Sequence, residues 1–436
     1  MDNPNQNPAS GFWRKPKIIK DAALGRITYQ KIADANASEL NAFLSQKTIQ
    51  GADQALSVYE FFNEGNAAPR FEDSMGAING IDVYRVTYKT RSPDTGKRYR
   101  VSGLLSVPVS ATQTSTGNNL PLVSWQHGTI LYPQDAPSNL FKQDAINLDP
   151  YGIPYSAETL FNLVKLGGNG FVVAASDYIG NDNSKNTQAY AVKETTVQTS
   201  HDMIKASKAI LSTLGIISED VFLNGWSQGG LNTQWLANAL QAKGDPAERI
   251  AVSSGPSDVY QTLKYWVNDY PGTPPWLSSV VPLLIGAYQK YYNMDGLMRK
   301  SIQPQYLKTA KQIYNKTYDW SKGLPNLPVD PKQMLTDKII GQINSGEGVF
   351  ADKIINNTAL QAEYISSSVF FGGDNDTVVP PLYSIMIPVD YQASLGSTIA
   401  SGENMGAAAT HRSTFLSSLF DKSQSNVLDL FTSSYL

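Results

Sequence analysis

The sequence predicts an α/β fold, with a mostly parallel central sheet flanked by helices and interrupted by a mainly helical insertion. Two observations support this prediction. From residue 120 onward, short apolar runs alternate with amphipathic segments of helical length, a pattern typical of right-handed βαβ units. The alternation stops for about a hundred residues and then returns, which indicates an inserted subdomain rather than a loop.

The first elements differ from the rest of the chain. Residues 1–80 carry few signals apart from a helical pattern at 37–46, and we expect an N-terminal extension that packs on the core. Residues 81–109 hold two segments rich in β-branched and aromatic residues, joined by Ser-Pro-Asp-Thr-Gly. That composition predicts an antiparallel hairpin.

The alternating part of the chain follows the hairpin. Its apolar runs are continuous, as in strands of a sheet that is covered on both faces. The expected strands are 120–126, 171–178, 221–225 and 249–254, and the expected helices are 157–166, 195–214 and 229–241.

The core is expected at 81–257 and 363–436, and the insertion at 258–362. After the insertion, the alternation of strands and helices resumes with the strand pattern Ser-Val-Phe-Phe-Gly-Gly, a helix after Pro380-Pro381 and a last strand near 397–401. Aromatic side chains crowd the first part of the insertion. They could form the core of the subdomain or the apolar wall of a substrate pocket. These residues are Trp266, Tyr270, Trp276, Tyr288, Tyr291 and Tyr292.

Composition excludes several classes of protein. The chain has 436 residues, 41% of them hydrophobic and 17% charged, which is too apolar for a disordered protein. A formal charge of −3 gives no electrostatic footprint for nucleic acid. The absence of cysteine excludes disulfides and thiolate chemistry, and three histidines disfavour a metal centre, so we expect no cofactor. No apolar run is long enough to span a bilayer.

The N-terminus is polar and shows no signal peptide. We expect a secreted or periplasmic protein whose signal has been removed, although a cytoplasmic enzyme would have the same composition. The oligomeric state is left open by the sequence.

The most specific motif is Gly225-Trp226-Ser227-Gln228-Gly229, which matches G-x-S-x-G. A buried strand pattern precedes it and an amphipathic helix pattern follows it. A sharp strand-to-helix turn of this kind lifts the serine hydroxyl clear of the sheet. The motif therefore predicts that Ser227 is a nucleophile, with a plain helix N-cap as the alternative.

A serine nucleophile requires a base and an acid that orients it, and in this fold they follow the serine in the order acid, histidine. His411 is the histidine that lies after Ser227. Two aspartates follow the strand before it. Asp376 begins the pattern D-x-x-V-P and is the favoured acid, while Asp374 is the competitor that could brace the loop.

Donors for an oxyanion are expected from the Gln228 backbone N–H and from Thr129 in the loop His127-Gly128-Thr129. His127 is a rival base, but histidine in such loops usually braces the loop, and this is the interpretation we prefer. His201 is interpreted as an ordinary helix residue. Trp226, Trp266 and Trp276 are the candidate substrate contacts.

These residues resemble the α/β-hydrolase superfamily and, more narrowly, the secretory-lipase family of lipase-A-type enzymes and their bacterial relatives. The resemblance covers roughly residues 82–420, and the blocks that carry it follow one another in order along the chain. They are VSGLLSVP, PLVSWQHGT, DAPSN, ETLFNLVKLGGNGFVVAASDYIG, GWSQGG, DNDTVVP and THRSTF. The resemblance implies Ser227 as nucleophile, Asp376 as acid, His411 as base, and Thr129 and Gln228 as oxyanion donors. It also implies that the insertion is a helical lid over the acyl pocket.

Three functions remain open on the sequence alone. The leading one is hydrolysis of small-molecule or lipid carboxylic esters through an acyl-enzyme. A peptidase or amidase would use the same triad. A non-catalytic binding protein on the same scaffold is the third, because a fold does not fix a function.

Overall fold

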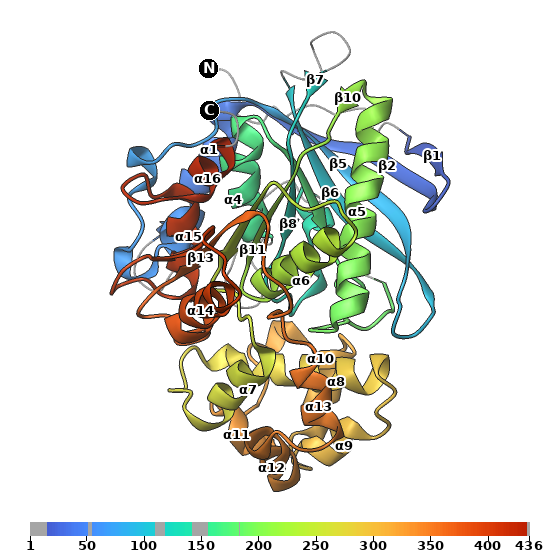
Figure 1. The fold of residues 1–436 in the computed structure, drawn as a ribbon, viewed down its shortest axis with the longest axis vertical. Helices are drawn as coiled ribbons and strands as arrows, with labels where there is room; N and C mark the ends of the chain where they lie inside the picture. The colour runs from blue at the N-terminus through green and yellow to red at the C-terminus, as the bar shows by residue number, and fades with distance from the viewer. Residues whose placement is uncertain (1–14, 51–54, 110–117, 142–155, 183, 434–436) are drawn as a thin grey trace, which may run out of the picture.

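The computed structural model describes residues 15–50, 55–109, 118–141, 156–182 and 184–433. A ten-stranded mixed sheet runs through the molecule in the order β1-β2-β5-β6-β9-β8-β11-β12-β13-β14 (Figure 1). Its strands are β1 (Lys17–Asp21), β2 (Gly25–Ala35), β5 (Ile81–Arg91), β6 (Arg98–Pro108), β8 (Leu122–Gln126), β9 (Val172–Ser176), β11 (Val221–Trp226), β12 (Arg249–Ser253), β13 (Ser367–Gly372) and β14 (Ala400–Asn404). Two short ribbons pair β3 (Lys47–Gln50) with β4 (Ala55–Ser57) and β7 (Asn118–Asn119) with β10 (Ile216–Ile217).

The sheet has a parallel half and an antiparallel half. Strands β9, β8, β11, β12, β13 and β14 pair in parallel, whereas β1, β2, β5 and β6 form an antiparallel meander that joins β9. The predicted hairpin is β5–β6, which pairs from Ile81↔Pro108 to Arg91↔Arg98. The antiparallel half is larger than the sequence pattern indicated, because β1 and β2 lie in the extension where we predicted only a helix.

Helices cover both faces of the sheet. On one face lie α5 (Lys193–Thr213) and α6 (Gln228–Ala242). The other face carries α1 (Ala37–Ser45), α2 (Val58–Phe62), α4 (Ala157–Lys165), α15 (His411–Phe420) and α16 (Val427–Thr432). A π-helical turn at Leu382–Met386 leads into α14 (Ile387–Ser394) beside the last strands.

Two apolar cores follow from the alternation of side chains along each strand. In β8, Leu122 packs into the core beneath α5 and α6, while its neighbour Val123 packs into the core beneath α4 and α15. Each apolar run of a parallel strand therefore contributes side chains to the cores on both faces of the sheet, as expected for a parallel sheet covered by helices on both sides.

The insertion forms a group of helices at one end of the sheet, below it in Figure 1. Its buried apolar side chains are continuous with the core beneath α5 and α6. Its helices are α7 (Val259–Asn268), α8 (Val280–Tyr291), α9 (Leu297–Ser301), α10 (Leu307–Tyr314), α11 (Pro331–Met334), α12 (Asp337–Ser345) and α13 (Val349–Ile355). No helix among the described residues has the length and apolar character needed to cross a membrane.

Candidate active site

Ser227 lies at the sharp turn between β11 and α6. Its backbone has φ 57° and ψ −123°, a combination that non-glycine residues rarely adopt. The Ser227 N–H donates to the Ser253 carbonyl oxygen of β12 at 3.0 Å, which ties the turn to the neighbouring strand. The elbow expected from the motif is therefore present in the backbone.

The glycines around Ser227 are required by close packing. A Cβ on Gly229 would lie 1.8 Å from the Gln126 carbonyl oxygen, and one on Gly225 would lie 2.2 Å from Thr233 Oγ1. Both distances are far below a van der Waals contact. These positions must lack a side chain for the elbow to fit against β8 and α6.

A hydrogen-bonded chain joins Ser227, His411 and Asp376. Ser227 Oγ lies 2.8 Å from His411 Nε2, and His411 Nδ1 lies 2.8 Å from Asp376 Oδ2. The Ser227, His411 and Asp376 side chains are buried. Since a carboxylate accepts, Nδ1–H donates to Asp376 and leaves Nε2 free to accept from the serine hydroxyl.

The two candidate aspartates differ in their surroundings. Asp376 is buried, and its Oδ1 accepts from the N–H groups of Val378 and Val379 at 2.9 Å each. Asp374 is exposed, and its Oδ1 accepts from Asn404 Nδ2 at 2.6 Å. The structure thus brings Asp376 to the imidazole and places Asp374 in a bond that braces the outer loop.

The N-terminal segment holds the residues on either side of His411. Glu64 accepts from Thr410 Oγ1 at 3.0 Å and pairs with Arg412 Nη1 at 2.5 Å. The indole Nε1–H of Trp226 donates to the His411 carbonyl oxygen at 2.9 Å. His411 is therefore fixed through its backbone and both neighbours, as well as through its ring.

The loop after β8 lies against the elbow. Thr129 Oγ1 lies 3.0 Å from the Tyr190 hydroxyl, and the Gly128 N–H donates to Glu158 Oε2 at 2.7 Å. The Gln228 N–H stands in the first turn of α6, where amides have no acceptor within the helix. Thr129 and Ser227 line the same two cavities, and Gln228 lines one of them.

The other two histidines are engaged elsewhere. His127 Nδ1 donates to the Gly128 carbonyl oxygen at 2.7 Å, and its ring stacks on Tyr178 at 4.1 Å between centroids. Burial lowers the pKa of His127 to about 4. His201 Nδ1 lies 3.0 Å from Lys243 Nζ, and burial, with the nearby Lys205 and Lys243, lowers its pKa to about 4. His127 braces its own loop, and His201 lies at the contact between α5 and the end of α6.

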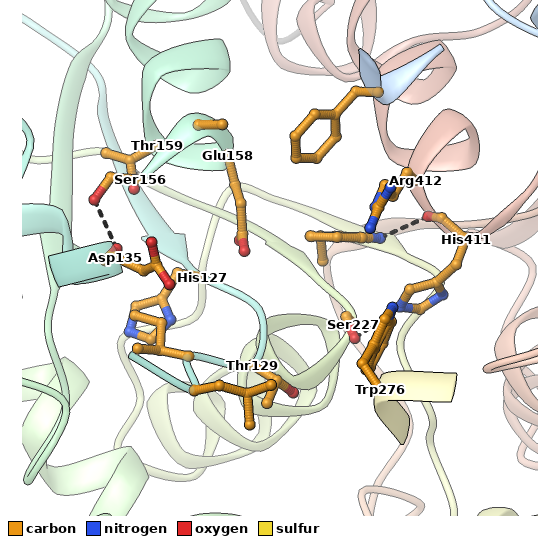
Figure 2. Close-up of a pocket in the computed structure, with 15 residues that line it drawn as sticks. His127, Thr129, Asp135, Ser156, Glu158, Thr159, Ser227, Trp276, His411 and Arg412 are labelled. Carbon is orange, nitrogen blue, oxygen red and sulfur yellow. Dashed lines mark hydrogen bonds between the residues drawn. The ribbon is translucent and has the colours of Figure 1, made fainter. Parts of the chain in front are cut away.

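A cavity of about 840 Å³, part of it open to solvent, opens at Ser227 on the side of His411. Figure 2 shows the residues that line it, with the Glu158 side chain descending from α4 towards the space between Thr129 and Arg412. Burial raises the pKa of the Glu158 carboxyl to about 7, although the Gly128 N–H opposes this shift. Polar and aromatic side chains thus share this cavity.

A second cavity, of about 550 Å³, adjoins Ser227 on the side of Gln228 and extends beneath the insertion. Its lining is mostly apolar and includes Leu231, Val259, Leu263, Trp266, Leu277, Val280, Leu284, Val378 and Val379. Trp276 and Thr129 line both cavities.

The six aromatic residues singled out in the insertion could form the core of the subdomain or the wall of a substrate pocket, and the structure places some of them in each setting. Trp266 and Trp276 line a cavity at Ser227, and Trp226 lines the cavity on the His411 side. The four tyrosines contribute to neither cavity and hydrogen-bond within the protein instead, with partners Pro274, Asn357 and Thr187. Among the described residues, no group of three His, Asp or Glu side chains could hold a metal ion.

Solved structures with the same arrangement of elements are α/β-hydrolases. An esterase, LipA of Xanthomonas oryzae, described as degrading rice cell walls, aligns with TM-score 0.68 and 18% identity over 94% of this chain and 97% of its own. Candida antarctica lipase A aligns with TM-score 0.56 and 15% identity over 80% and 79%. The chain has the α/β-hydrolase fold. A proposed hydrolase of Legionella pneumophila aligns with TM-score 0.71 and 18% identity over 88% and 92%.

The prolyl oligopeptidase family model matches residues 158–265, which include the elbow and the start of the insertion. No curated protein matches the sequence. The resemblance to lipase-A-type enzymes is thus confirmed at the level of the fold.

The sequence patterns did not identify three residues of the site. Glu158 and Tyr190 stand in helical or loop segments with no motif of their own, and Glu64 lies in the extension that carried few signals. Their positions depend on contacts between segments that lie far apart in the sequence.

Proposed function

We propose that this protein is a serine hydrolase that cleaves carboxylic esters through an acyl-enzyme intermediate. The observation that supports this proposal is the hydrogen-bonded chain Ser227–His411–Asp376 on a strained elbow, open to two cavities. A serine hydroxyl alone is a weak nucleophile, and this chain supplies the base and the carboxylate that activate it.

The first half-reaction forms the acyl-enzyme. Ser227 Oγ attacks the ester carbonyl carbon while its proton passes to His411 Nε2, and Asp376 stabilises the resulting imidazolium. The negative charge on the carbonyl oxygen is stabilised by the Gln228 N–H and by Thr129. When the tetrahedral intermediate collapses, the ester C–O bond breaks and the leaving alkoxide takes the proton from Nε2.

The second half-reaction reverses these roles with water. Water gives a proton to Nε2 and attacks the acyl carbon, and the intermediate releases the acid as Oγ recovers the proton. The removal of one oxyanion donor typically costs about 10²–10³ in kcat, so Thr129 and Gln228 carry a large share of the proposed rate.

The alcohol and acyl portions of the ester would bind in different cavities. His411 must protonate the leaving oxygen, and it lines the larger cavity but not the apolar one. The alcohol portion therefore belongs on the His411 side, and the acyl chain belongs in the apolar cavity beneath the insertion. In this proposal the insertion acts as a lid that sets acyl-chain length.

The test is a panel of p-nitrophenyl acetate, butyrate and laurate beside aminoacyl anilides. We expect turnover of the esters and a loss of several orders of magnitude in kcat for Ser227→Ala, with unchanged circular dichroism. Ester turnover that survives Ser227→Ala in a folded protein would contradict the proposal.

A peptidase or amidase is the second candidate, because the prolyl oligopeptidase family model matches the segment around Ser227. The same chemistry would apply, with an amine as leaving group. Faster cleavage of anilides than of the butyrate ester would favour this candidate. A folded wild-type protein that cleaves neither would indicate a binding protein on the same scaffold.

A further inference from the structure

The cavity on the His411 side contains a carboxylate that the proposed reaction does not use. Glu158 is the second residue of α4, and its side chain points from that helix into the cavity that Ser227 and His411 also line (Figure 2). The carboxylate lies on the side of Ser227 assigned to the leaving alcohol, so a role for it in substrate choice rests on the proposed function.

Only one of the two carboxylate oxygens of Glu158 has a partner. Oε2 accepts from the Gly128 N–H at 2.7 Å, and no described residue donates to Oε1. The neighbouring cation Arg412 is already paired with Glu64 at 2.5 Å and lies over the Phe61 ring at 4.7 Å. Within the described part of the chain, Glu158 makes no ion pair.

The Glu158 carboxylate is partly buried without a counter-charge among the described residues. Burying a charge without a counter-charge costs free energy, and a cation that enters the cavity would recover part of that cost. Aromatic faces are present as well, because Phe62, Trp226 and Trp276 line the same cavity and could attract a cation.

We propose that Glu158 is a specificity-determining residue that selects esters whose alcohol portion carries a cationic nitrogen. The cation would lie between Glu158 Oε1 and the aromatic lining, with the leaving oxygen directed to His411 Nε2. The acyl chain would occupy the apolar cavity on the other side of Ser227.

The test compares two butyrate esters with alcohols of the same shape. Choline butyrate carries a permanent charge, and 3,3-dimethylbutyl butyrate replaces its nitrogen with carbon. We expect the ratio of their kcat/KM values at pH 8 to favour the choline ester about tenfold, the factor expected from about 1.4 kcal/mol. In Glu158→Gln this ratio should fall at least fivefold, because the amide can still accept from Gly128 but carries no charge.

Glu248→Gln is the matched control. Glu248 is exposed and precedes β12 at the amino end of the strand, at the opposite edge of the sheet from Ser227, so its loss removes the same charge from the protein without touching the cavity. The ratio should be unchanged in this variant.

The pH dependence separates a charge effect from a change in shape. Burial raises the pKa of Glu158 to about 7, so the carboxyl is mostly neutral at pH 6 and mostly ionised at pH 8. The choline preference should therefore grow with pH in the wild type and stay flat in Glu158→Gln. The other ionisable groups that face the cavity are Asp135, His127, His411 and Arg412. Tyr178 also interacts electrostatically with Glu158, and all five groups remain in both proteins.

A binding measurement makes the inference testable without turnover. We expect choline to bind Ser227→Ala at least tenfold more tightly than Ser227→Ala combined with Glu158→Gln, as measured by calorimetry. The inference would be overturned if the ratio of kcat/KM for the choline ester to that for the neutral ester were the same in wild type and Glu158→Gln. It would also be overturned if Glu158→Gln left the affinity for choline unchanged. Failure of the neutral ester to turn over, with choline binding still dependent on Glu158, would instead contradict the proposed ester hydrolysis.

Discussion

At Ser227 the backbone adopts a positive φ of 57°, and contacts on all sides hold it there. The serine N–H is tied to β12, and glycines two positions before and after it allow β8 and α6 to approach closely. Strain of this kind costs on the order of 1–3 kcal/mol and persists only where the surroundings impose it. This backbone conformation directs the Ser227 hydroxyl away from the end of the sheet. The hydroxyl does not cap α6, because it makes no hydrogen bond to the first amides of that helix.

Asp374 and Asp376 lie in the loop of residues 373–381 after β13, here called the acid loop, and provide the first prediction. We expect Asp376→Asn to lower kcat by about four orders of magnitude, because an amide at this position misorients the imidazole and leaves its positive charge without a counter-charge. Asp374→Asn should cost less than about threefold, since its oxygen can still accept from Asn404. Ester kinetics of both variants would check this, and equal losses would reverse the assignment.

The positions of the candidate site residues were predictable wherever a local motif carried them. The strand and helix patterns around Ser227 predicted the elbow, and chain order left His411 as the candidate base. The choice of Asp376 rested on the D-x-x-V-P pattern, and the structure shows the loop geometry behind that pattern: Oδ1 binds two amides and Oδ2 faces the histidine. Glu158 could not be predicted, because its environment is made by a loop thirty positions away in sequence.

At the scale of elements, helix α7 of the insertion is bonded to the acid loop. The Tyr265 hydroxyl donates to the Thr377 carbonyl at 2.9 Å, and Trp266 Nε1–H donates to the Val378 carbonyl at 2.8 Å. These carbonyls stand one and two positions after Asp376. The insertion therefore contributes to the position of Asp376, the proposed acid, as well as to the wall of the apolar cavity.

A second prediction follows from these bonds. Tyr265→Phe should lower kcat about threefold to tenfold with little change in KM for p-nitrophenyl acetate, because the acid loop loses one of its supports. Tyr260→Phe on the same helix is the control, since no hydrogen bond of its hydroxyl is found within the described residues. A similar change in both variants would show that α7 has no specific influence on the acid loop.

A third prediction concerns the wall of the apolar cavity. Trp276→Ala should lower kcat/KM for butyrate more than for acetate, by about fourfold for each methylene that loses its contact, at about 0.8 kcal/mol per methylene. Tyr292→Ala changes an aromatic residue of the insertion that lines neither cavity and should leave the chain-length profile unchanged. An unchanged profile in folded Trp276→Ala would move the acyl wall elsewhere.

For the whole molecule, the parallel half of the sheet was predictable and the antiparallel edge was not. Continuous apolar runs identify strands that are buried on both faces, and the pattern in 120–254 is of this kind. Strands β1 and β2 are half exposed and rich in Lys and Asp. Charges of this kind on β1, the edge strand of the sheet, help to prevent association with other chains. The pattern of β1 and β2 therefore lacks the apolar periodicity on which the prediction depended.

A fourth prediction concerns the stability of the whole fold against pH. Asp177 is fully buried, its Oδ2 has no hydrogen-bond partner among the described residues, and burial raises its pKa to about 6. Because the native state holds this proton more tightly than the unfolded chain, the contribution of Asp177 to stability falls as pH rises from about 4 to 6 and is constant above that. The loss is up to about 3 kcal/mol.

Asp177→Asn removes this charge and retains an oxygen that can accept from the Ser138 N–H. We expect the difference in unfolding free energy between the variant and the wild type to move in favour of the variant between about pH 4 and pH 6 and then level off. Urea denaturation at several pH values across this range would measure it. A difference that does not vary with pH would show that Asp177 titrates normally.

The bonds from α7 to the acid loop also limit how the protein can be engineered. Exchange of the insertion for one from another scaffold would leave the sheet and the elbow untouched, because both lie outside residues 258–362. Here a transplanted insertion would remove the groups that donate to the Thr377 and Val378 carbonyls. It would also remove the hydrogen bond between Thr377 Oγ1 and the Thr273 carbonyl. A functional chimera would have to keep α7 and the following turn as far as Thr273 with the recipient, so the usable boundary for recombination lies after Thr273 rather than at the edge of the sheet.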